Sequence, residues 1–205
     1  MTLTYKIKKA FEQPGEILPY FYRAVRRKFS IKRVLVNGEL FYQYGDDMYP
    51  GYLANQSAAP FIFNRARSFC CGIGLDIGAG SSAFPGSIAV QNDPRQNAYQ
   101  LDNFADESLD YIFSSHCLEH LERWQEALGL WMKKIRSDGI LFLYLPHQSM
   151  RLWHPKGLWA GTDHKWIPTC EILLDFLANN GMEIVEYNPD KDEYWSFHIV
   201  ARKKG

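Results

Sequence analysis

A buried acid followed by a glycine turn is the feature of this sequence that points most directly to chemistry. An apolar strand pattern at residues 74–77 contains Asp76 and then turns through Gly78 and Gly80. In an open α/β sheet, ligands bind beyond the carboxyl ends of the strands, and glycine lets the backbone approach a ligand because it carries no Cβ. The pattern therefore predicts a ligand site, with Asp76 available to a cationic ammonium group of the ligand.

Residues 78–83 also match the dinucleotide fingerprint G-x-G-x-x-A. That fingerprint must open a helix whose N-terminus takes the pyrophosphate. Pro85 and Gly86 follow too soon for such a helix, and no acid sits twenty residues on in the place where the fingerprint expects one. The nicotinamide interpretation is therefore the weaker one. Because a full crossover takes at least ~10–12 residues, we expect a reduced or missing first crossover helix and a more open pocket.

Two histidines and a glutamate form a metal-like motif further along the chain. The run His116-Cys-Leu-Glu119-His120 matches the zinc pattern H-x-x-E-H, in which the histidines bind zinc and the glutamate acts as base. However, His116 falls at the junction between a predicted strand and a predicted helix, and no third ligand is evident nearby. We therefore predict no metal site.

A loop rich in His and Trp occupies residues 147–167. Long loops in compact domains are usually functional, so we interpret this one as a lid over an acceptor molecule. Its candidate acceptor contacts are His154, Trp159, Asp163 and His164. The two histidines and Asp163 also fit an open metal triad, and the tryptophans could instead pack the loop onto the sheet. The sequence leaves these alternatives open.

Strand and helix patterns alternate along most of the chain. Apolar runs predict strands at residues 73–77, 88–90, 109–114 and 140–145. Helical spacing predicts helices at residues 58–70, from 118 to the Asp138-Gly139 turn, and at 170–180 after a Thr169 cap. Strands at 183–187 and 195–202 have no helix between them and should pair as an antiparallel hairpin at or near an edge. Together these elements predict an α/β fold with a mostly parallel sheet covered on both faces.

The first 55 residues have a different character. Apolar residues spaced four apart from Ile17 to Phe29 predict an amphipathic helix. Asn37-Gly38 between two β-rich runs predicts a hairpin, because both turn residues need positive φ. Turns at residues 46–47 and 50–51 end this region. We therefore expect an N-terminal helix-and-hairpin extension over residues 1–55 and a main domain over residues 56–205.

Three blocks of sequence resemble the class I S-adenosylmethionine-dependent methyltransferases, in particular the subgroup that includes many small-molecule enzymes. The blocks are residues 75–80, 106–121 and 137–146, and their order fits the family's first, fourth and fifth strands. The resemblance implies a Rossmann-like methyltransferase domain over residues 56–205, S-adenosylmethionine as cofactor, and methyl transfer to a small-molecule or carbohydrate-like acceptor.

The resemblance also implies roles for individual residues. Gly78, Ala79 and Gly80 would line the methionine and ribose part of the cofactor, and Ser115 would border its sulfonium. Asp102, with Asn103 beside it, lies where the family places an acid that accepts a hydrogen bond from the adenine amino group.

One position departs from the family pattern. Gln91 stands where the family usually has the acid that holds both ribose hydroxyls, and Asp93 follows two residues later. A carboxamide can bond a diol but adds no charge, so cofactor binding would lose one charge-assisted hydrogen bond.

A hydroxyl acceptor must lose its proton, which requires a general base. His116 is the first candidate because it follows the fourth family strand, and His147, just after the fifth, is the second; an imidazole has a pKa near working pH. The rival from another class is a binding or regulatory module that keeps the fold without turnover, which Gln91 and the short crossover favour.

Composition bounds the remaining possibilities. The 205 residues carry 23 basic and 23 acidic side chains, and a net charge of zero argues against general nucleic-acid binding. The apolar runs are far shorter than the ~20 residues of a membrane span, and the N-terminus lacks the apolar region of a secretory signal. Four cysteines without a C-x-x-C pair predict a reducing, cytoplasmic location. The sequence predicts no particular oligomeric state.

Overall fold

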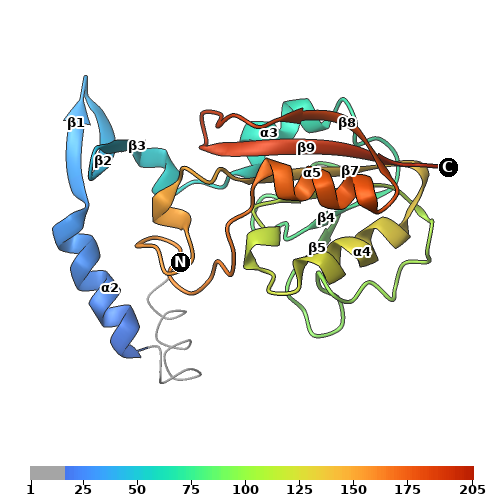
Figure 1. Ribbon diagram of the computed structural model, residues 1–205, viewed down its shortest axis with the longest axis horizontal. Coiled ribbons are helices and arrows are strands. Elements are labelled where there is room, and N and C mark those ends of the chain that lie inside the picture. Colours follow the sequence, from blue (N-terminus) through green and yellow to red (C-terminus); the bar gives the residue numbers. More distant parts are fainter. Residues whose placement is uncertain (1–16) are drawn as a thin grey trace.

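Two sheets organise the chain (Figure 1). The computed structural model describes residues 17–205, so the first part of the predicted extension, residues 1–16, lies outside the described residues. A six-stranded sheet forms the larger part of the molecule, and a three-stranded antiparallel sheet with one helix lies at the other end. No helix within residues 17–205 is long and apolar enough to cross a membrane.

The larger sheet is mostly parallel, as predicted. Its strands are β4 (Gly74–Ile77), β5 (Ile88–Val90), β6 (Leu109–Ser115), β7 (Ile135–Pro146), β8 (Met182–Asn188) and β9 (Ser196–Lys203). They lie in the order β5-β4-β6-β7-β9-β8. The first four pair in parallel, whereas β9 pairs antiparallel with both β7 and β8. The predicted antiparallel hairpin at one edge is confirmed. The chain runs from β4 outward to β5 and from β6 the other way to β7, so the order reverses between β4 and β6.

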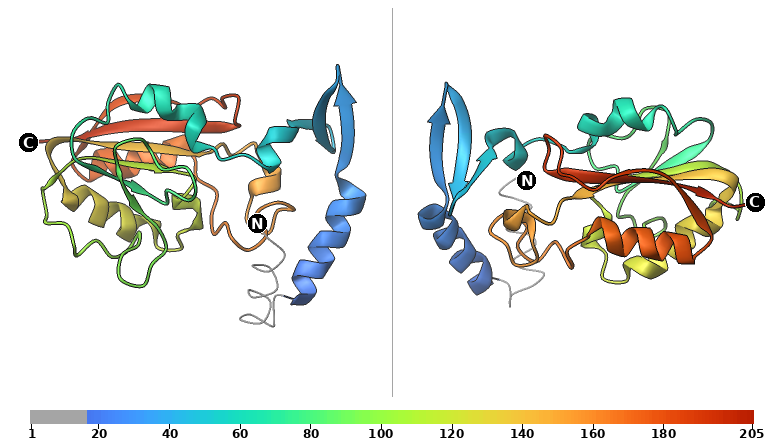
Figure 2. Two further views of the ribbon diagram at one scale, coloured as in Figure 1. Left: turned by 180° about the vertical axis from the view of Figure 1, so that it is seen from behind. Right: turned by 45° about the horizontal axis from the view of Figure 1, so that its top comes forward.

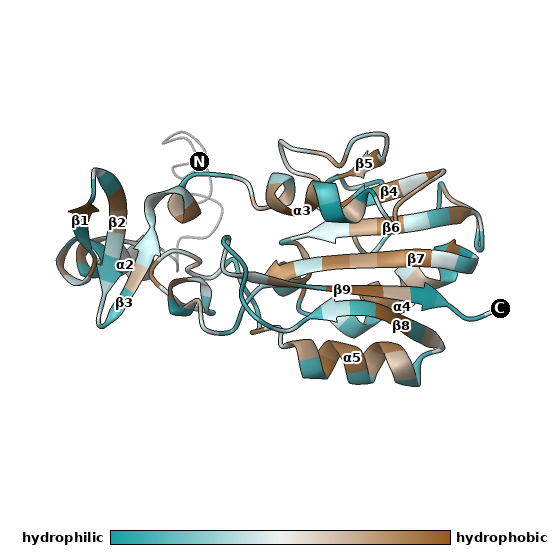
Figure 3. Ribbon diagram, turned by 90° about the horizontal axis from the view of Figure 1, so that it is seen from above, coloured by the Kyte–Doolittle hydropathy of each residue, from teal (hydrophilic) through white to brown (hydrophobic). Residues whose placement is uncertain are grey.

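Helices cover both faces of this sheet (Figure 2). α4 (Trp124–Lys134) and α5 (Cys170–Asn179) lie on one face, and α3 (Ala59–Ala66) lies on the other. β6 and the second half of β7 are almost fully buried because both faces of the sheet are covered, and β7 is largely apolar (Figure 3). The two apolar layers hold the sheet rigid beneath its carboxyl edge.

α5 begins and ends where the sequence predicts. The side-chain oxygen of Thr169 accepts a hydrogen bond from the backbone N–H of Ile172 at 3.3 Å, which satisfies one of the free donors of the first turn. Gly181 follows the helix with a φ of +83°, the left-handed conformation that commonly ends helices.

The helix predicted from residue 118 is wrong at its start. Leu118–His120 form a separate 3-10 helix, η3, and α4 begins only at Trp124. The carbonyls of Leu118 and Glu119 accept hydrogen bonds from Trp166 Nε1 at 2.9 Å and from the N–H of Lys165 at 2.8 Å. In an α-helix those carbonyls would accept hydrogen bonds from N–H groups four residues later. Because residues 165 and 166 donate to them instead, the helix stops after a single turn.

The same helix also ends earlier than predicted. The carbonyls of Lys133 and Lys134 accept hydrogen bonds from the N–H groups of Glu107 and Ser108 at 2.9 and 3.0 Å. The strand that follows therefore begins at Ile135 rather than at residue 140. The Asp138-Gly139 pair lies inside this strand, at an irregular register with β6, and does not end a helix.

The first crossover of the sheet has no helix, as the short connection predicts. Residues 78–87 connect β4 to β5 as a loop, and Phe84 occupies the space beside the sheet. Its ring is 2% exposed, stacks on Phe113 with centroids 4.9 Å apart, and meets Tyr111 and Phe63 edge-on. One aromatic side chain thus covers sheet surface that a crossover helix would otherwise cover.

The smaller sheet contains the predicted hairpin and one unpredicted strand. Its elements are α2 (Ile17–Ser30), β1 (Lys32–Val36), β2 (Glu39–Tyr44) and β3 (Asp47–Pro50), followed by the 3-10 helix η2 (Gly51–Ala54). Asn37 and Gly38 both have positive φ, +52° and +85°, which confirms the turn. Asp46 lies in the turn after β2, as predicted, whereas Asp47 and Pro50, also expected in turns, pair with β2 as the ends of β3. The domain boundary at residue 55 stays a prediction.

The smaller sheet packs on the loop that follows β7. Trp159 meets the rings of Tyr42 and Tyr49 at 5.4 and 6.1 Å, and Arg151 pairs with Asp47 at 2.6 Å. That loop contains the 3-10 helix η4 (Arg151–Trp153). The arrowheads of β6 and β7 point toward this end of the molecule (Figure 3). The smaller sheet therefore lies beyond the carboxyl edge of the larger one.

We expect Phe84→Ala to lower the free energy of unfolding by about 3–5 kcal/mol, because it would leave a cavity where the crossover helix is missing. Urea denaturation measures the loss. Ile88→Ala on β5, where the side chain is 45% exposed, is the control and should cost much less. Equal losses in the two variants would contradict the packing role of Phe84.

Candidate functional site

The carboxyl ends of three neighbouring strands bring predicted site residues to one edge of the larger sheet. Gly78 follows β4, Gln91 follows β5, and Ser115 ends β6. This edge lies where the strand order reverses, which is the position at which open α/β sheets bind ligands. The ligand site predicted after Asp76 therefore lies at the edge of the sheet where this fold class binds ligands.

The two glycines of the turn have different reasons to be glycine. Gly78 has a φ of +84°, and a Cβ built on it would lie 2.4 Å from the Cβ of Cys117. Gly80 has a φ of +55°, and a Cβ there would meet only the carbonyl oxygen of Gly78 at 3.9 Å. Gly78 is thus needed for internal packing, whereas Gly80 leaves exposed backbone open to a ligand, with the buried Ala79 between them.

Asp76 anchors the glycine turn from below. Its carboxylate is 1% exposed, and Oδ2 accepts a hydrogen bond from the N–H of Phe84 at 2.7 Å. Oδ1 is buried and has no hydrogen-bond partner among the described residues. Burial raises the pKa of this carboxyl to about 6, although the Phe84 hydrogen bond opposes the rise. One oxygen therefore holds the loop, and the other is left for a donor that residues 17–205 do not supply.

Of two adjacent serines at the end of β6, one has a hydrogen-bond partner within the protein and the other has none among the described residues. Ser114 Oγ donates a hydrogen bond to the carbonyl oxygen of Ile77 at 2.8 Å and so ties β6 to β4. Ser115 Oγ is buried without a partner among residues 17–205. Sequence reasoning found Ser115 through the family resemblance but missed Ser114, which has no signal beyond its place in the strand. A buried hydroxyl without a partner is costly, so Ser115 indicates a ligand.

The residues expected to hold the nucleoside lie in the turn-rich segment after β5. Gln91 Nε2 donates to the carbonyl oxygen of Gly80 at 2.9 Å and so braces the glycine turn. Asp93 Oδ1 accepts from the N–H of Arg95 at 2.9 Å.

Asp102 and Asn103 are exposed on that segment. Gln100 Nε2 lies 3.5 Å from Asp102 Oδ2, and Asn103 Nδ2 donates to Gln96 Oε1 at 3.3 Å. These contacts are local, so both side chains can turn to a nucleoside at little cost.

Both candidate bases are fixed by serine hydroxyls. His116 Nε2 is 2.7 Å from Ser196 Oγ, and its ring meets three aromatic rings edge-on: Tyr144, Trp153 and Tyr194. Burial holds the pKa of His116 well below its usual value. His147 Nδ1 is 2.7 Å from Ser149 Oγ, and burial, followed by the charge of Lys191, lowers its pKa. Both imidazoles are therefore neutral at physiological pH.

The four predicted acceptor contacts of the loop do not act as one group. His154 Nε2 is 2.6 Å from the carbonyl oxygen of Gln148, and Trp159 packs against the smaller sheet. Asp163 and His164 instead lie beside η3, because the carbonyl of Asp163 is 3.1 Å from His120 Nδ1.

Glu119 gathers three imidazoles around one carboxylate oxygen. Its Oε1 is 3.7 Å from His116 Nδ1, 3.8 Å from His120 Nε2 and 3.9 Å from His164 Nε2. The side chain has no exposed surface, and neither oxygen has a hydrogen-bond partner among the described residues. The sequence motif contained Glu119 and His120, but His164 is distant in the chain and only the fold reveals it.

Ionisation of Asp76 should destabilise the ligand-free protein. In the unfolded chain this carboxyl ionises near its ordinary pKa of 3.8, and in the folded protein near 6. Between these values the folded state binds more protons than the unfolded state, so the free energy of unfolding falls as pH rises through 6.

We therefore compare the unfolding free energy of Asp76→Asn with that of the wild type at two pH values. The variant's advantage over the wild type should be about 1.4 kcal/mol larger at pH 7.5 than at pH 5, the equivalent of one pKa unit. Urea denaturation at both pH values measures the difference. The exposed Asp102→Asn variant is the control. An unchanged difference between Asp76→Asn and wild type across this range would refute the raised pKa.

Comparison with known proteins identifies the fold of the larger sheet. Residues 72–143 match the sequence model of a family described as a methyltransferase domain. No curated protein sequence matches the chain.

Solved structures share the fold at low identity. A methyltransferase of Thermotoga maritima described as a possible histamine N-methyltransferase has a TM-score of 0.58 and 16% identity, over 75% of this chain and 93% of that one. The Burkholderia thailandensis 1,6-didemethyltoxoflavin-N1-methyltransferase, solved with S-adenosylhomocysteine, has a TM-score of 0.53 and 14% identity, over 72% and 77%. The [4+2]-cyclase SpnF has a TM-score of 0.51 and 13% identity, over 74% and 84%.

The residues at the carboxyl edge fit the cofactor of this family. Oδ1 of Asp76 and Oγ of Ser115 are buried without partners among the described residues, and Gly80 exposes backbone between them and Gln91. Such groups suit a ligand that carries ammonium and hydroxyl donors. Residues 72–143 therefore match a methyltransferase domain, the larger sheet has the fold of class I S-adenosylmethionine-dependent methyltransferases, and these comparisons indicate S-adenosylmethionine as the cofactor.

Proposed function

We propose that this protein is an enzyme that transfers a methyl group from S-adenosylmethionine to a hydroxyl group of a small-molecule or carbohydrate-like acceptor. The observation that carries the proposal is the Ser115 hydroxyl, which has no partner among the described residues and lies beside the open glycine turn, one residue before a partly buried, neutral His116. Cofactor-facing and base-like groups thus follow one another at the end of a single strand.

Different residues of the chain would contact different parts of the cofactor. Asp76 and Ser115 offer acceptors to the amino-acid part, and Gly80 gives its backbone room. Gln91 and Asp102 face the nucleoside in this proposal. When bound, S-adenosylmethionine supplies an electrophilic methyl group on its sulfonium. The rigid sheet orients the reactants, and orientation supplies much of the rate of an in-line displacement.

His116 is the residue we propose as general base. Its Nε2 is held by Ser196 and its ring by aromatic neighbours, so Nδ1, which lies 3.7 Å from Glu119 Oε1, is the nitrogen that takes a proton. The lowered pKa keeps the ring unprotonated at neutral pH, which a base requires, although it also weakens the base. His147, at the end of β7, is the second candidate.

The acceptor would lie on the side of the smaller sheet. Trp153 and Tyr194 stack with centroids 5.7 Å apart beside His116, and aromatic faces are suitable surfaces for sugar or aromatic rings. The loop of residues 147–167 follows the carboxyl end of β7 and is held there by the smaller sheet. These contacts favour a small acceptor over a large one.

A second candidate function is a binding module without turnover. The missing crossover helix and the engagement of Gln91 with Gly80 favour it, and the fold of SpnF carries a different reaction class. In either case we propose a cytoplasmic location, because all four cysteines are free thiols.

Ser115→Ala should weaken binding of S-adenosylhomocysteine by about 5–10-fold, because it removes one hydrogen bond to the ligand. Titration calorimetry measures the affinity. The unfolding free energy of the free protein should stay equal or rise, since an unpaired hydroxyl is lost. Ser114→Ala is the matched control and should show the reverse: lower stability and unchanged affinity. Failure of the wild type to bind either S-adenosylmethionine or S-adenosylhomocysteine would favour the module without turnover.

His116→Gln, which can keep the hydrogen bond to Ser196, should lower kcat by about 10²–10⁴-fold and change cofactor affinity little. The assay follows labelled methyl transfer to a panel of hydroxylated small molecules and glycans. His198→Gln, on β9 and bonded to Glu186, is the control and should keep its turnover. Full turnover in His116→Gln would remove His116 from the mechanism.

A further inference from the structure

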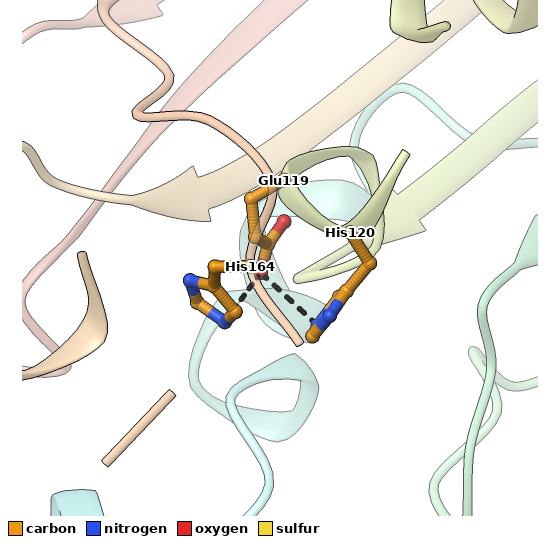
Figure 4. Close-up of side chains that lie close together, drawn as sticks. All are labelled: Glu119, His120 and His164. Atoms are coloured by element: carbon orange, nitrogen blue, oxygen red, sulfur yellow. Dashed lines mark ion pairs between the residues drawn. The ribbon is translucent and has the colours of Figure 1, made fainter. Parts of the chain in front are cut away.

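We propose that Glu119, His120 and His164 form a binding site for one divalent transition-metal ion (Figure 4). The two residues of η3 and the one residue of the later loop converge on a single point. The proposal stands on this cluster alone and does not depend on methyl transfer.

The cluster has the spacing of a metal site. The three ligand atoms all lie within 4.8 Å of one another, and Glu119 Oε1 is 3.8 and 3.9 Å from the Nε2 atoms of His120 and His164. An ion bound tetrahedrally at about 2.0–2.2 Å from each atom would set them about 3.4 Å apart. The two Glu119 distances would contract by about half an ångström, and the distance between the histidine ligand atoms, which is at most 4.8 Å, by up to about 1.4 Å. Side-chain rotation can supply both changes.

Hydrogen bonding does not account for the cluster. The contacts of Glu119 Oε1 with His120 and His164 are longer than the ~3.2 Å limit of an ordinary hydrogen bond, and both carboxylate oxygens lack any hydrogen-bond partner among the described residues. Glu119 has no exposed surface, so water does not solvate it. A buried carboxyl group without partners is costly, and a bound cation would remove that cost.

The imidazoles already present the correct nitrogens. His120 Nδ1 is 3.1 Å from the carbonyl oxygen of Asp163, so Nδ1 carries the proton and Nε2 directs its lone pair toward Glu119. Metal-binding histidines commonly donate their second nitrogen to a backbone carbonyl in this way. His164 Nε2 also faces Glu119 Oε1, at 3.9 Å.

Backbone contacts fix the two segments relative to each other. The N–H of Lys165 donates to the carbonyl of Glu119 at 2.8 Å, and Trp166 Nε1 donates to the carbonyl of Leu118 at 2.9 Å. These bonds flank His164 and hold it beside η3. A metal site on a preorganised frame needs little rearrangement to bind its ion.

The types of ligand atom indicate which ions the site would bind, and the exposure of the two histidines indicates which side of the site faces solvent. Two imidazoles and one carboxylate suit Zn²⁺, Fe²⁺, Co²⁺ or Mn²⁺, whereas Mg²⁺ and Ca²⁺ prefer oxygen ligands. The His120 side chain is 41% exposed, against 11% for His164, so the ion would reach solvent on the His120 side. Positions left open there suit water or an oxygen of a bound molecule.

The test is titration calorimetry of ZnCl₂ into the full-length, chelator-treated protein, with metal content checked by mass spectrometry. We expect one Zn²⁺ per chain in the wild type. His120→Ala, His164→Ala and the isosteric Glu119→Gln should each weaken binding by at least ~100-fold, since even supporting partners contribute 10–100-fold. Co²⁺ should give visible absorption in the wild type that these variants lose.

His198→Gln is the matched control, because His198 also faces a carboxylate, Glu186 Oε1 at 3.0 Å, without a third ligand. It should bind Zn²⁺ like the wild type. Circular dichroism verifies the fold of each variant. No Zn²⁺ binding by the wild type, or binding that survives all three ligand variants, would overturn the proposal. S-adenosylhomocysteine titration of the same proteins reports separately on the cofactor site.

Discussion

The carboxyl edge of the larger sheet, where we place the cofactor, depends on one hydrogen bond. The N–H of Phe84 donates it to the buried carboxylate of Asp76. A chain without a crossover helix must return from β4 to β5 in a short loop, and this bond fixes the loop over the strand end. Phe84 then replaces the helix in the apolar layer against Phe113. Because one carboxylate oxygen is occupied and the other is not, the structural anchor also leaves an acceptor beside the open turn at Gly80.

A second constraint acts after β6. The loop that follows β7 donates to the carbonyls of Leu118 and Glu119, which ends the helical turn and brings His164 against the buried Glu119. The same two bonds therefore explain why α4 begins late and why a carboxylate and imidazoles converge. The smaller sheet stabilises this loop from outside through Trp159. The proposed cofactor site, the cluster around Glu119 and the proposed acceptor site thus all lie at the carboxyl end of the larger sheet.

Local patterns predicted the elements whose causes are local. The Asn37-Gly38 turn, the Thr169 cap and the missing crossover helix all follow from residues adjacent in the chain, and all are confirmed. The errors arise where distant segments supply the partner. No periodicity shows that Lys165 would occupy the carbonyl of Glu119, so the helix was predicted too long. For the same reason the motif at residues 116–120 lacked a third ligand until the fold brought His164 to it.

The glycine turn after Asp76 as a cradle for S-adenosylmethionine is the central claim, and a crystal structure of the protein with S-adenosylhomocysteine tests it most directly. The account predicts nucleoside density along the carboxyl edge of β4, with the amino-acid end between Gly80 and Ser115 and the adenine near Asp102. Crystals grown at saturating ligand that show this edge filled by the protein's own side chains, or the ligand bound elsewhere, would contradict it.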